Sequence, residues 1–181
     1  MPKGSYQFMG AFFKNGSAIE GMPMRIAVTL ILFSIILGLS AKAFYNFTYD
    51  NKEKKLMGEM NLIEKRAAAM YIQGGARDFN DPDDFSGSME NIRVNIPDNV
   101  VFVVFGGMPS PDKKPMETRD LRTDNVYYYV MDNGRVQAGS SIARYSSNDP
   151  YLNSPFVLYP GKYELTLELV KNKNGTYVKI E

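Results

Sequence analysis

The chain contains no cysteine, no histidine and no tryptophan in its 181 residues. The absence of cysteine excludes disulfides and thiol nucleophiles, and the absence of histidine excludes histidine acid–base catalysis and Cys/His zinc sites. A domain outside a membrane must therefore be held by its apolar core, in which the 12 tyrosines and 11 phenylalanines are expected. The net charge is +1, and no basic patch is interleaved with aromatic residues, so nothing indicates nucleic-acid binding.

The longest uncharged stretch is residues 26–41, which lies between Arg25 and Lys42. A membrane span needs about 20 predominantly apolar residues, and the segment reaches that length when the two flanking cations extend to the headgroup layers. Aromatic residues follow where an interfacial belt is expected: Phe44, Tyr45, Phe47 and Tyr49. We predict a single transmembrane helix over residues 22–49; the alternatives are a buried core helix and a secretory signal.

Residues 1–21 precede this helix and are predicted to form a leader or cytoplasmic tail. Pro23 fits the first turn of the membrane helix, where its missing N–H has little cost. Basic residues flank the apolar segment on both sides, so charge alone does not fix the orientation.

Beyond Asp50 the sequence becomes polar but keeps a helical period. Apolar residues recur at spacings of four, three, four and three, at Leu56, Met60, Ile63, Ala67 and Met70. Gly74 and Gly75 are expected to end the helix after Gln73. We predict an amphipathic helical stalk over residues 50–75, whose apolar stripe packs on the chain's own domain, on other copies, or on both.

The segment after the stalk is rich in carboxylates. Residues 78–84 contain four aspartates and an asparagine, which are oxygen ligands suited to calcium. The spacing differs from that of the twelve-residue calcium loop, and a solvated turn is the ordinary interpretation. Both interpretations stay open at this point, and no cofactor is assigned.

From Ile92 onward the hydrophobic period changes to two. Residues 100–105 are apolar on both faces, as in a central strand. Asn133-Gly134 and Asn174-Gly175 each lie between strand-like runs, which predicts two hairpins. Further strands are predicted at residues 142–145 and 156–159. The fold class is therefore α+β: a long N-terminal helix followed by an extracytoplasmic head, residues 76–181, with about seven short antiparallel strands in a β-sandwich-like arrangement.

No catalytic constellation is apparent, and we expect the protein not to be an enzyme. Ser140 and Ser141 have no general base near them in the sequence, and Glu164 and Glu168 are expected on the solvated face of a strand. The run of residues 126–130 contains three consecutive tyrosines, which suit a recognition surface. Alternating residues of a strand point to opposite faces, so core packing is the alternative for this run.

Three Asn-x-Ser/Thr tripeptides begin at Asn15, Asn46 and Asn174. Glycosylation requires an exposed acceptor on the outer side of a membrane. Asn46 and Asn174 are the candidates, and Asn174, in a predicted hairpin turn, is the better one because Asn46 is close to the lipid.

Residues 14–25, Lys-Asn-Gly-Ser-Ala-Ile-Glu-Gly-Met-Pro-Met-Arg, lead into the apolar helix and resemble the start of archaeal type IV pilin-like proteins. These archaellum- or pilus-related proteins carry a class III signal peptide, which a prepilin peptidase cuts on the cytoplasmic side. The resemblance implies that Lys14 ends the basic leader, that Gly16 marks the cut and that Glu20 helps to pair subunits. The sequence motif itself covers about a dozen residues, and the similarity in architecture covers about the first 75 residues.

The sequence departs from the pattern of a major pilin at several positions. Asn15 separates Lys14 from Gly16, and a cut after Gly16 makes Glu20 the fourth rather than the fifth residue. Proline and arginine inside the assembling helix are more similar to minor subunits or anchored assembly proteins.

The resemblance implies a filament or assembly subunit whose partners are membrane lipids, other pilin-like subunits and the peptidase. The alternative is an uncleaved single-pass protein whose extracellular β-domain binds a surface-layer, glycan or protein partner.

Overall fold

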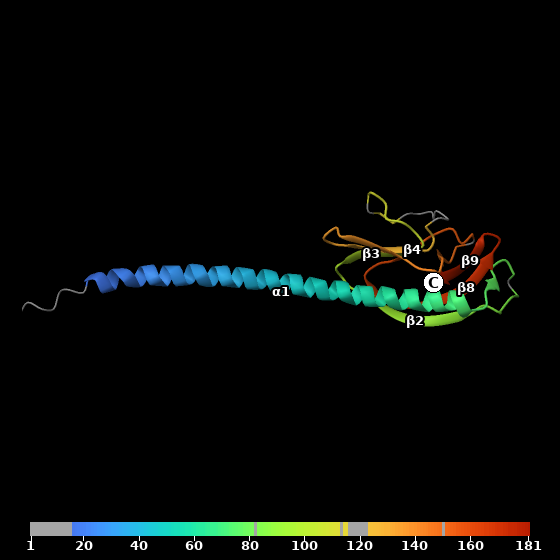
Figure 1. Ribbon diagram of the computed structural model, residues 1–181, viewed down its shortest axis with the longest axis horizontal. Helices are drawn as coiled ribbons and strands as arrows, with labels where there is room; N and C mark the ends of the chain where they lie inside the picture. Colours follow the sequence, from blue (N-terminus) through green and yellow to red (C-terminus); the bar gives the residue numbers. More distant parts are fainter. Residues whose placement is uncertain (1–15, 82, 113, 116–122, 150) are drawn as a thin grey trace, which may run out of the picture. The chain divides into compact units, whose positions relative to one another are not determined.

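The computed structural model describes residues 16–81, 83–112, 114–115, 123–149 and 151–181. It has an α+β fold: a long N-terminal helix, α1 (Gly16–Gln73), precedes the β-strands of the described residues. The chain divides into two compact units between Thr48 and Tyr49. The second unit therefore contains the last part of α1 together with all of these strands (Figure 1).

The strands are mostly short, and β8 is the longest of them. Their bounds are β1 (Arg77–Asp78), β2 (Met89–Ile96), β3 (Val100–Phe105), β4 (Val126–Met131), β5 (Val136–Ser140), β6 (Tyr145–Ser147), β7 (Phe156–Leu158), β8 (Gly161–Asn172) and β9 (Gly175–Ile180).

Helix α1 ends at Gln73, as the sequence predicts, and the amide of Gly74 donates a hydrogen bond to the Met70 carbonyl at 2.7 Å. The expectation for Pro23 is wrong, because α1 begins at Gly16 and Pro23 lies inside the helix. There the proline ring removes one main-chain hydrogen bond, a cost that the first turn would have avoided.

One sheet is built around β8 and has five strands. The order is β1-β8-β9-β6, and β2 pairs with β8 along residues 161–168. The β8–β9 and β2–β8 pairs are antiparallel, but β1–β8 and β6–β9 are parallel. The prediction of purely antiparallel strands is therefore wrong, since parallel partners arrive through long connections that local sequence patterns do not reveal.

The other sheet has four antiparallel strands in the order β5-β4-β3-β7. Both predicted hairpins are confirmed: β4 pairs with β5 around Asn133-Gly134, and β8 pairs with β9 around Asn174-Gly175. The strand predicted at residues 142–145 is wrong in its bounds, because β6 begins only at Tyr145. No strand was predicted at β1, which has only two residues and leaves no periodic signal.

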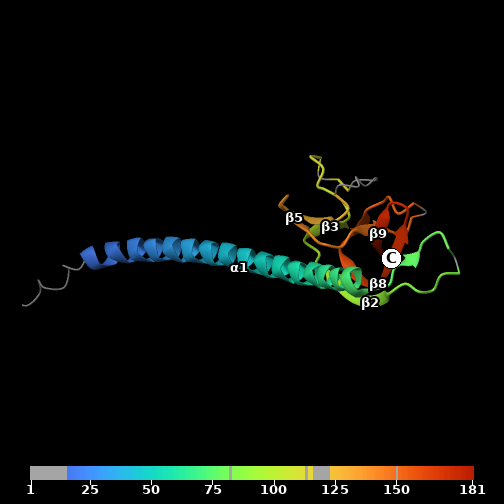
Figure 2. The same cartoon turned by 45° about the vertical axis from the view of Figure 1, so that its right-hand side comes forward.

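The main apolar cluster draws on both sheets and on the helix. It includes the inward side chains of β2 and β8, such as Ile92 and Leu167, and those of β3 and β4, such as Val103 and Tyr129. The part of α1 in this unit runs alongside β2 in both views (Figure 1, Figure 2). Burial of each large aliphatic side chain in such a cluster contributes about 1.5–3 kcal/mol.

Strand β3 is apolar on both faces, as predicted, because each face of its sheet carries an apolar cluster. Val103 and Phe105 belong to the main cluster, whereas Phe102 and Val104 form a second cluster with Tyr128 and Val130. If polar residues alternated along β3, one of these two clusters would lose the apolar side chains that β3 contributes to it.

Candidate functional site

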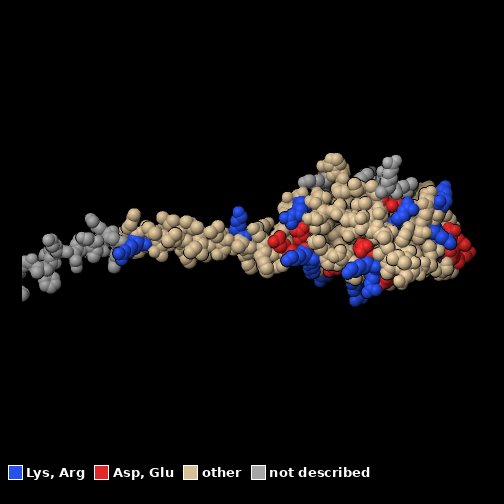
Figure 3. Space-filling view, viewed as in Figure 1, with Lys and Arg blue, Asp and Glu red and all other residues tan. Residues whose placement is uncertain are grey.

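The apolar part of α1 has the length and composition to span a membrane. An 18-residue window within Pro23–Gln73 has a mean hydropathy of 2.2, and none of its residues is buried. The large apolar side chains of this part are exposed; Ile26, for example, is 59% exposed and Leu39 is 65% exposed. On the face shown in Figure 3, this part of the helix is uncharged apart from basic side chains near its two ends. Large exposed apolar surfaces mark sites of membrane or protein contact, and this part of the helix is long and apolar enough to cross a membrane.

Three hydroxyl groups in this part of α1 donate hydrogen bonds to main-chain carbonyls of the helix. Thr29 and Ser34 donate to the carbonyls of Arg25 and Leu30, each at 2.8 Å, and Thr48 donates to the Phe44 carbonyl at 3.0 Å. Because these polar groups need no water, they do not oppose burial in hydrocarbon.

The three residues that resemble a pilin leader lie at the beginning of the chain. Lys14 is outside the described residues, Gly16 is the first residue of α1, and Glu20 follows within the first turns of the helix.

The stripe predicted in the stalk is brought onto the chain's own sheets. All five side chains are in the main cluster and are between 0% and 8% exposed: Leu56, Met60, Ile63, Ala67 and Met70. The same core that joins the two sheets therefore covers this face of the helix, and the face is not open to a second copy of the chain.

Glu53 is a buried acidic residue of α1 that sequence reasoning missed. It is 7% exposed, accepts a hydrogen bond from the Tyr129 hydroxyl at 3.0 Å and forms an ion pair with Arg135 at 2.5 Å. Burial, together with the hydrogen bond to the Glu53 carboxylate, raises the pKa of Tyr129 above its usual value. The phenol therefore stays protonated and keeps donating, which fixes the helix to the β4–β5 hairpin.

Other polar contacts join α1 to the strands and their turns. Lys52 pairs with Asp98 at 2.6 Å, and Arg66 pairs with Glu90 at 2.9 Å. Exposed pairs such as Lys52–Asp98 contribute about 0–1 kcal/mol. These contacts link α1 to β2 and to the turn that follows β2, and they add little stability.

Ser141, which has no base near it in the sequence, donates a hydrogen bond to Glu64 of α1 at 2.9 Å. Its Oγ also accepts the amide of Ala143 at 3.1 Å, and the side chain is 9% exposed. Through these two hydrogen bonds, the buried Ser141 hydroxyl links the helix to the connection between β5 and β6.

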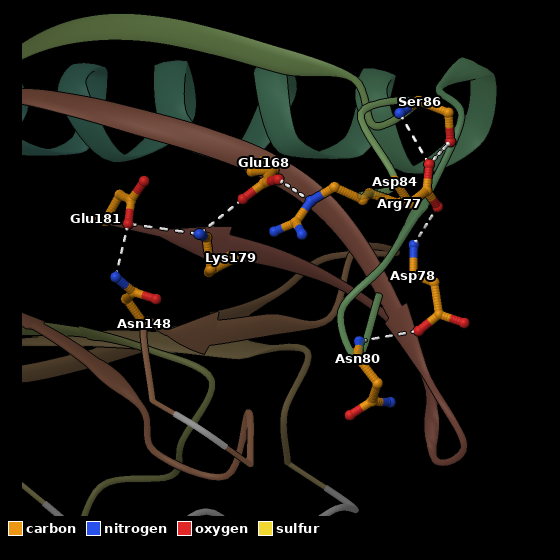
Figure 4. A network of polar contacts seen from close by, with 9 residues as sticks. All are labelled: Arg77, Asp78, Asn80, Asp84, Ser86, Asn148, Glu168, Lys179 and Glu181. Atoms are coloured by element: carbon orange, nitrogen blue, oxygen red, sulfur yellow. Dashed lines mark hydrogen bonds and ion pairs between the residues drawn. The ribbon is translucent and has the colours of Figure 1, made fainter. Parts of the chain in front are cut away.

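A charge network centred on the buried Glu168 and Lys179 lies on the face of the five-stranded sheet opposite the main apolar cluster (Figure 4). Glu168 accepts from Arg77 at 2.6 Å and from Lys179 at 2.7 Å, and Lys179 also lies 3.4 Å from Glu181. Asn148 donates to the same Glu181 carboxylate at 2.8 Å. The network thus joins β1, β8 and β9 through side chains.

The expectation that Glu168 is solvated is wrong, because it is 4% exposed. Burial by itself raises the pKa of Glu168, but the hydrogen bonds from Arg77 and Lys179 outweigh it and hold this pKa below its usual range. Glu164 does follow the prediction, with a side chain that is 65% exposed.

The tyrosine run does not form the recognition surface that was considered for it. Tyr128 and Tyr129 are 1% and 4% exposed, and they belong to different apolar clusters. Tyr127 packs against the main cluster beside Phe105, with ring centroids 5.8 Å apart. Core packing on both faces of the sheet accounts for all three rings.

The aspartates after the stalk organise a turn. Asp84 accepts hydrogen bonds from the amides of Asp78 at 2.7 Å and Ser86 at 2.9 Å, and from the Ser86 hydroxyl at 2.6 Å. These bonds, the one from the Asp78 amide first, lower the pKa of Asp84 to about 2. Among the described residues, no group of three or more acidic side chains has the arrangement of a metal site.

Comparisons of this chain with protein-family models, with curated proteins and with solved structures found no match.

Proposed function

We propose that the chain is a membrane-anchored, pilin-like structural or assembly subunit of an archaeal cell-surface filament. Its apolar helix segment lies in the membrane or in the filament core, and its β-domain, a sandwich-like head, lies outside the cell. Its partners are membrane lipids, other pilin-like subunits and a prepilin peptidase, and its role is structural, not enzymatic.

One observation carries this proposal: a single helix contains both an exposed apolar segment and a stripe that is part of the head's core. The apolar segment has no buried residue in its most hydrophobic window, whereas Leu56 and Ile63 of the same helix are fully buried. A removable signal sequence has no need to continue as a core element of the domain that it delivers.

The resemblance of the first residues supports the filament side of the proposal. A cut after Gly16 would create a new N-terminal amine on Ser17, three residues before Glu20. A carboxylate next to an apolar helix is costly in lipid unless it is paired, and the amine of a neighbouring subunit would provide that partner.

The N-terminal residue of the protein from membranes or from sheared surface filaments tests this function. Ser17 or Gly16 as the first residue supports processing and assembly, and an intact Met1 or Pro2 contradicts it. Gly16→Val should block the cut, whereas Gly10→Val, in the same leader, should leave it unchanged.

The placement of the head is tested separately by adding a protease to intact cells. Digestion of the head is expected. Full protection, with the protease shown to be active on another surface protein, would contradict an exterior head.

The second candidate function is an uncleaved single-pass anchor whose exterior β-domain binds a surface-layer, glycan or protein partner. The favouring observation is that Arg25 and Lys42 enclose the uncharged residues 26–41. Two cations at this separation suit the two headgroup layers of a bilayer, whereas a tightly packed core of helices would have to desolvate them.

A further inference from the structure

The structure separates the Asn-x-Ser/Thr tripeptides of the chain by their local geometry. Asn15 lies outside the described residues. Asn46 lies within α1, and the hydroxyl of Thr48, the third residue of its tripeptide, donates to the Phe44 carbonyl at 3.0 Å. This tripeptide is thus held in helical form within residues 22–49, the predicted membrane helix, with its hydroxyl turned to the main chain.

Asn174 lies in the two-residue turn between β8 and β9, and its side chain is exposed. Its amide N–H donates to Asn172 Oδ1 at 2.8 Å, and its carbonyl accepts from the Tyr177 hydroxyl at 3.3 Å and from Arg144 at 3.4 Å. The main-chain groups of Asn174 are therefore engaged, while its side-chain amide makes no hydrogen bond within the described part of the chain.

Buried and ion-paired side chains support this turn. The guanidinium of Arg144 lies 4.5 Å from the ring centroid of Tyr177, which is fully buried, and also donates to Asp124 at 2.7 Å. Gly175 has φ +139°, a conformation that favours glycine and lets the chain enter β9 directly after the turn. A large group attached to Asn174 would project into solvent without displacing any of these contacts.

The turn lies at the end of the head remote from Lys52. At the opposite end of β8, Gly161 pairs with Ile96, which precedes the turn whose Asp98 binds Lys52. At about 3.3 Å per residue, the twelve residues of β8 separate these two ends by roughly 35 Å.

We propose that Asn174 is the N-glycosylation site of this head, and that its donor is an oligosaccharide linked to a lipid phosphate. Asn174 Nδ2 forms a bond to the anomeric carbon of the sugar, and the bond from that carbon to the phosphate oxygen breaks. The lipid phosphate leaves with the bonding electrons, and the amide nitrogen loses one proton. Thr176 supplies the hydroxyl by which the transferase recognises the site. This inference rests on the exterior head of the proposed function.

The test expresses the full-length chain in an archaeal host that attaches N-glycans, and measures the masses of its peptides after isolation from membranes. The peptide that contains Asn174 should carry a glycan, and the peptide that contains Asn46 should not. Thr176→Ala should abolish the modification completely, whereas the matched Thr176→Ser should retain it because serine keeps the hydroxyl.

A second form of the chain carries Gly-Asn-Gly-Thr added after Glu181, as a flexible acceptor on the same head. A modified tail with an unmodified Asn174 overturns the proposed site and leaves the exterior head intact. If a host glycoprotein is modified but neither acceptor of the chain is, both the site and the exterior head are overturned. A glycan on Asn174 that persists in Thr176→Ala would also contradict the proposal.

Discussion

Replacing Ile63 with alanine tests whether the helix stripe belongs to the head's own core. Ile63 is fully buried in the main apolar cluster, so the substitution loses transfer free energy and leaves a cavity. The expected cost is about 2–5 kcal/mol, a large part of the about 5–15 kcal/mol that stabilises a typical domain. For a head of this size, 1 kcal/mol corresponds to roughly 4 °C, so the midpoint should fall by roughly 8–20 °C.

Ile72→Ala is the matched control, because Ile72 belongs to the same helix but is 67% exposed. A surface substitution of this kind changes stability by about 0.5 kcal/mol or less. The assay is thermal unfolding of the full-length chain in detergent micelles, followed by the near-ultraviolet circular dichroism of tyrosines such as Tyr128, Tyr145 and Tyr177, which are at most 1% exposed.

The reasoning fails if Ile63→Ala melts within about 2 °C of the unmodified chain, or if both variants shift equally. The Ile63→Ala shift should also be independent of protein concentration, since contacts within one chain are not subject to mass action. A shift that grows on dilution would instead assign the stripe to an interface between copies.

Three further predictions concern substitutions at Glu168, at the pair Gly58 and Gly175, and at Tyr129. Because the pKa of Glu168 is depressed, its contribution to stability is complete above about pH 4.5 and is lost as the pH falls through the lower pKa of the folded state. Glu168→Gln should therefore cost about 3–5 kcal/mol at pH 7 and less at pH 3, measured by urea unfolding, and an equal cost at both pH values would contradict the network. Gly58→Ala should stabilise the protein by about 0.5–1 kcal/mol, because Gly58 lies in a helix and a Cβ there meets no other atom. Gly175→Ala should destabilise the head, because Gly175 has φ +139°, a conformation that alanine rarely adopts. Thermal unfolding measures both midpoints, and equal shifts of one sign would refute this prediction. Tyr129→Phe should cost about 1–3 kcal/mol, because the buried Oε1 of Glu53 loses the phenol donor while Arg135 still binds Oε2, and an unchanged midpoint would show that the hydrogen bond is dispensable.

Local patterns in the sequence were sufficient for several elements. The run of uncharged residues and the spacing of Leu56 to Met70 predict helix, and the glycines after Gln73 predict its end. Asn133-Gly134 and Asn174-Gly175 predict both hairpins, because a turn and its flanking strands are encoded within about ten residues.

The candidate site was only partly predictable, because many of its contacts join residues that lie far apart in the sequence. The stripe can be found from its period, but the period does not say which surface covers it. Glu53 and Ser141 gave no signal, because their partners Arg135 and Glu64 lie 82 and 77 residues away in the sequence.

By itself, the sequence determined the helical period, the apolar segment, the hairpin turns and the alternation that places Tyr128 opposite Tyr127 and Tyr129. Only the tertiary structure decided that the stripe packs on the chain's own sheets and that Glu168 is buried. It also decided that β1 runs parallel to its partner β8, and β6 parallel to its partner β9. Side-chain periodicity is a property of neighbours along the chain. Burial and ion pairing instead depend on which distant strands meet, and that is settled by the packing of the whole head.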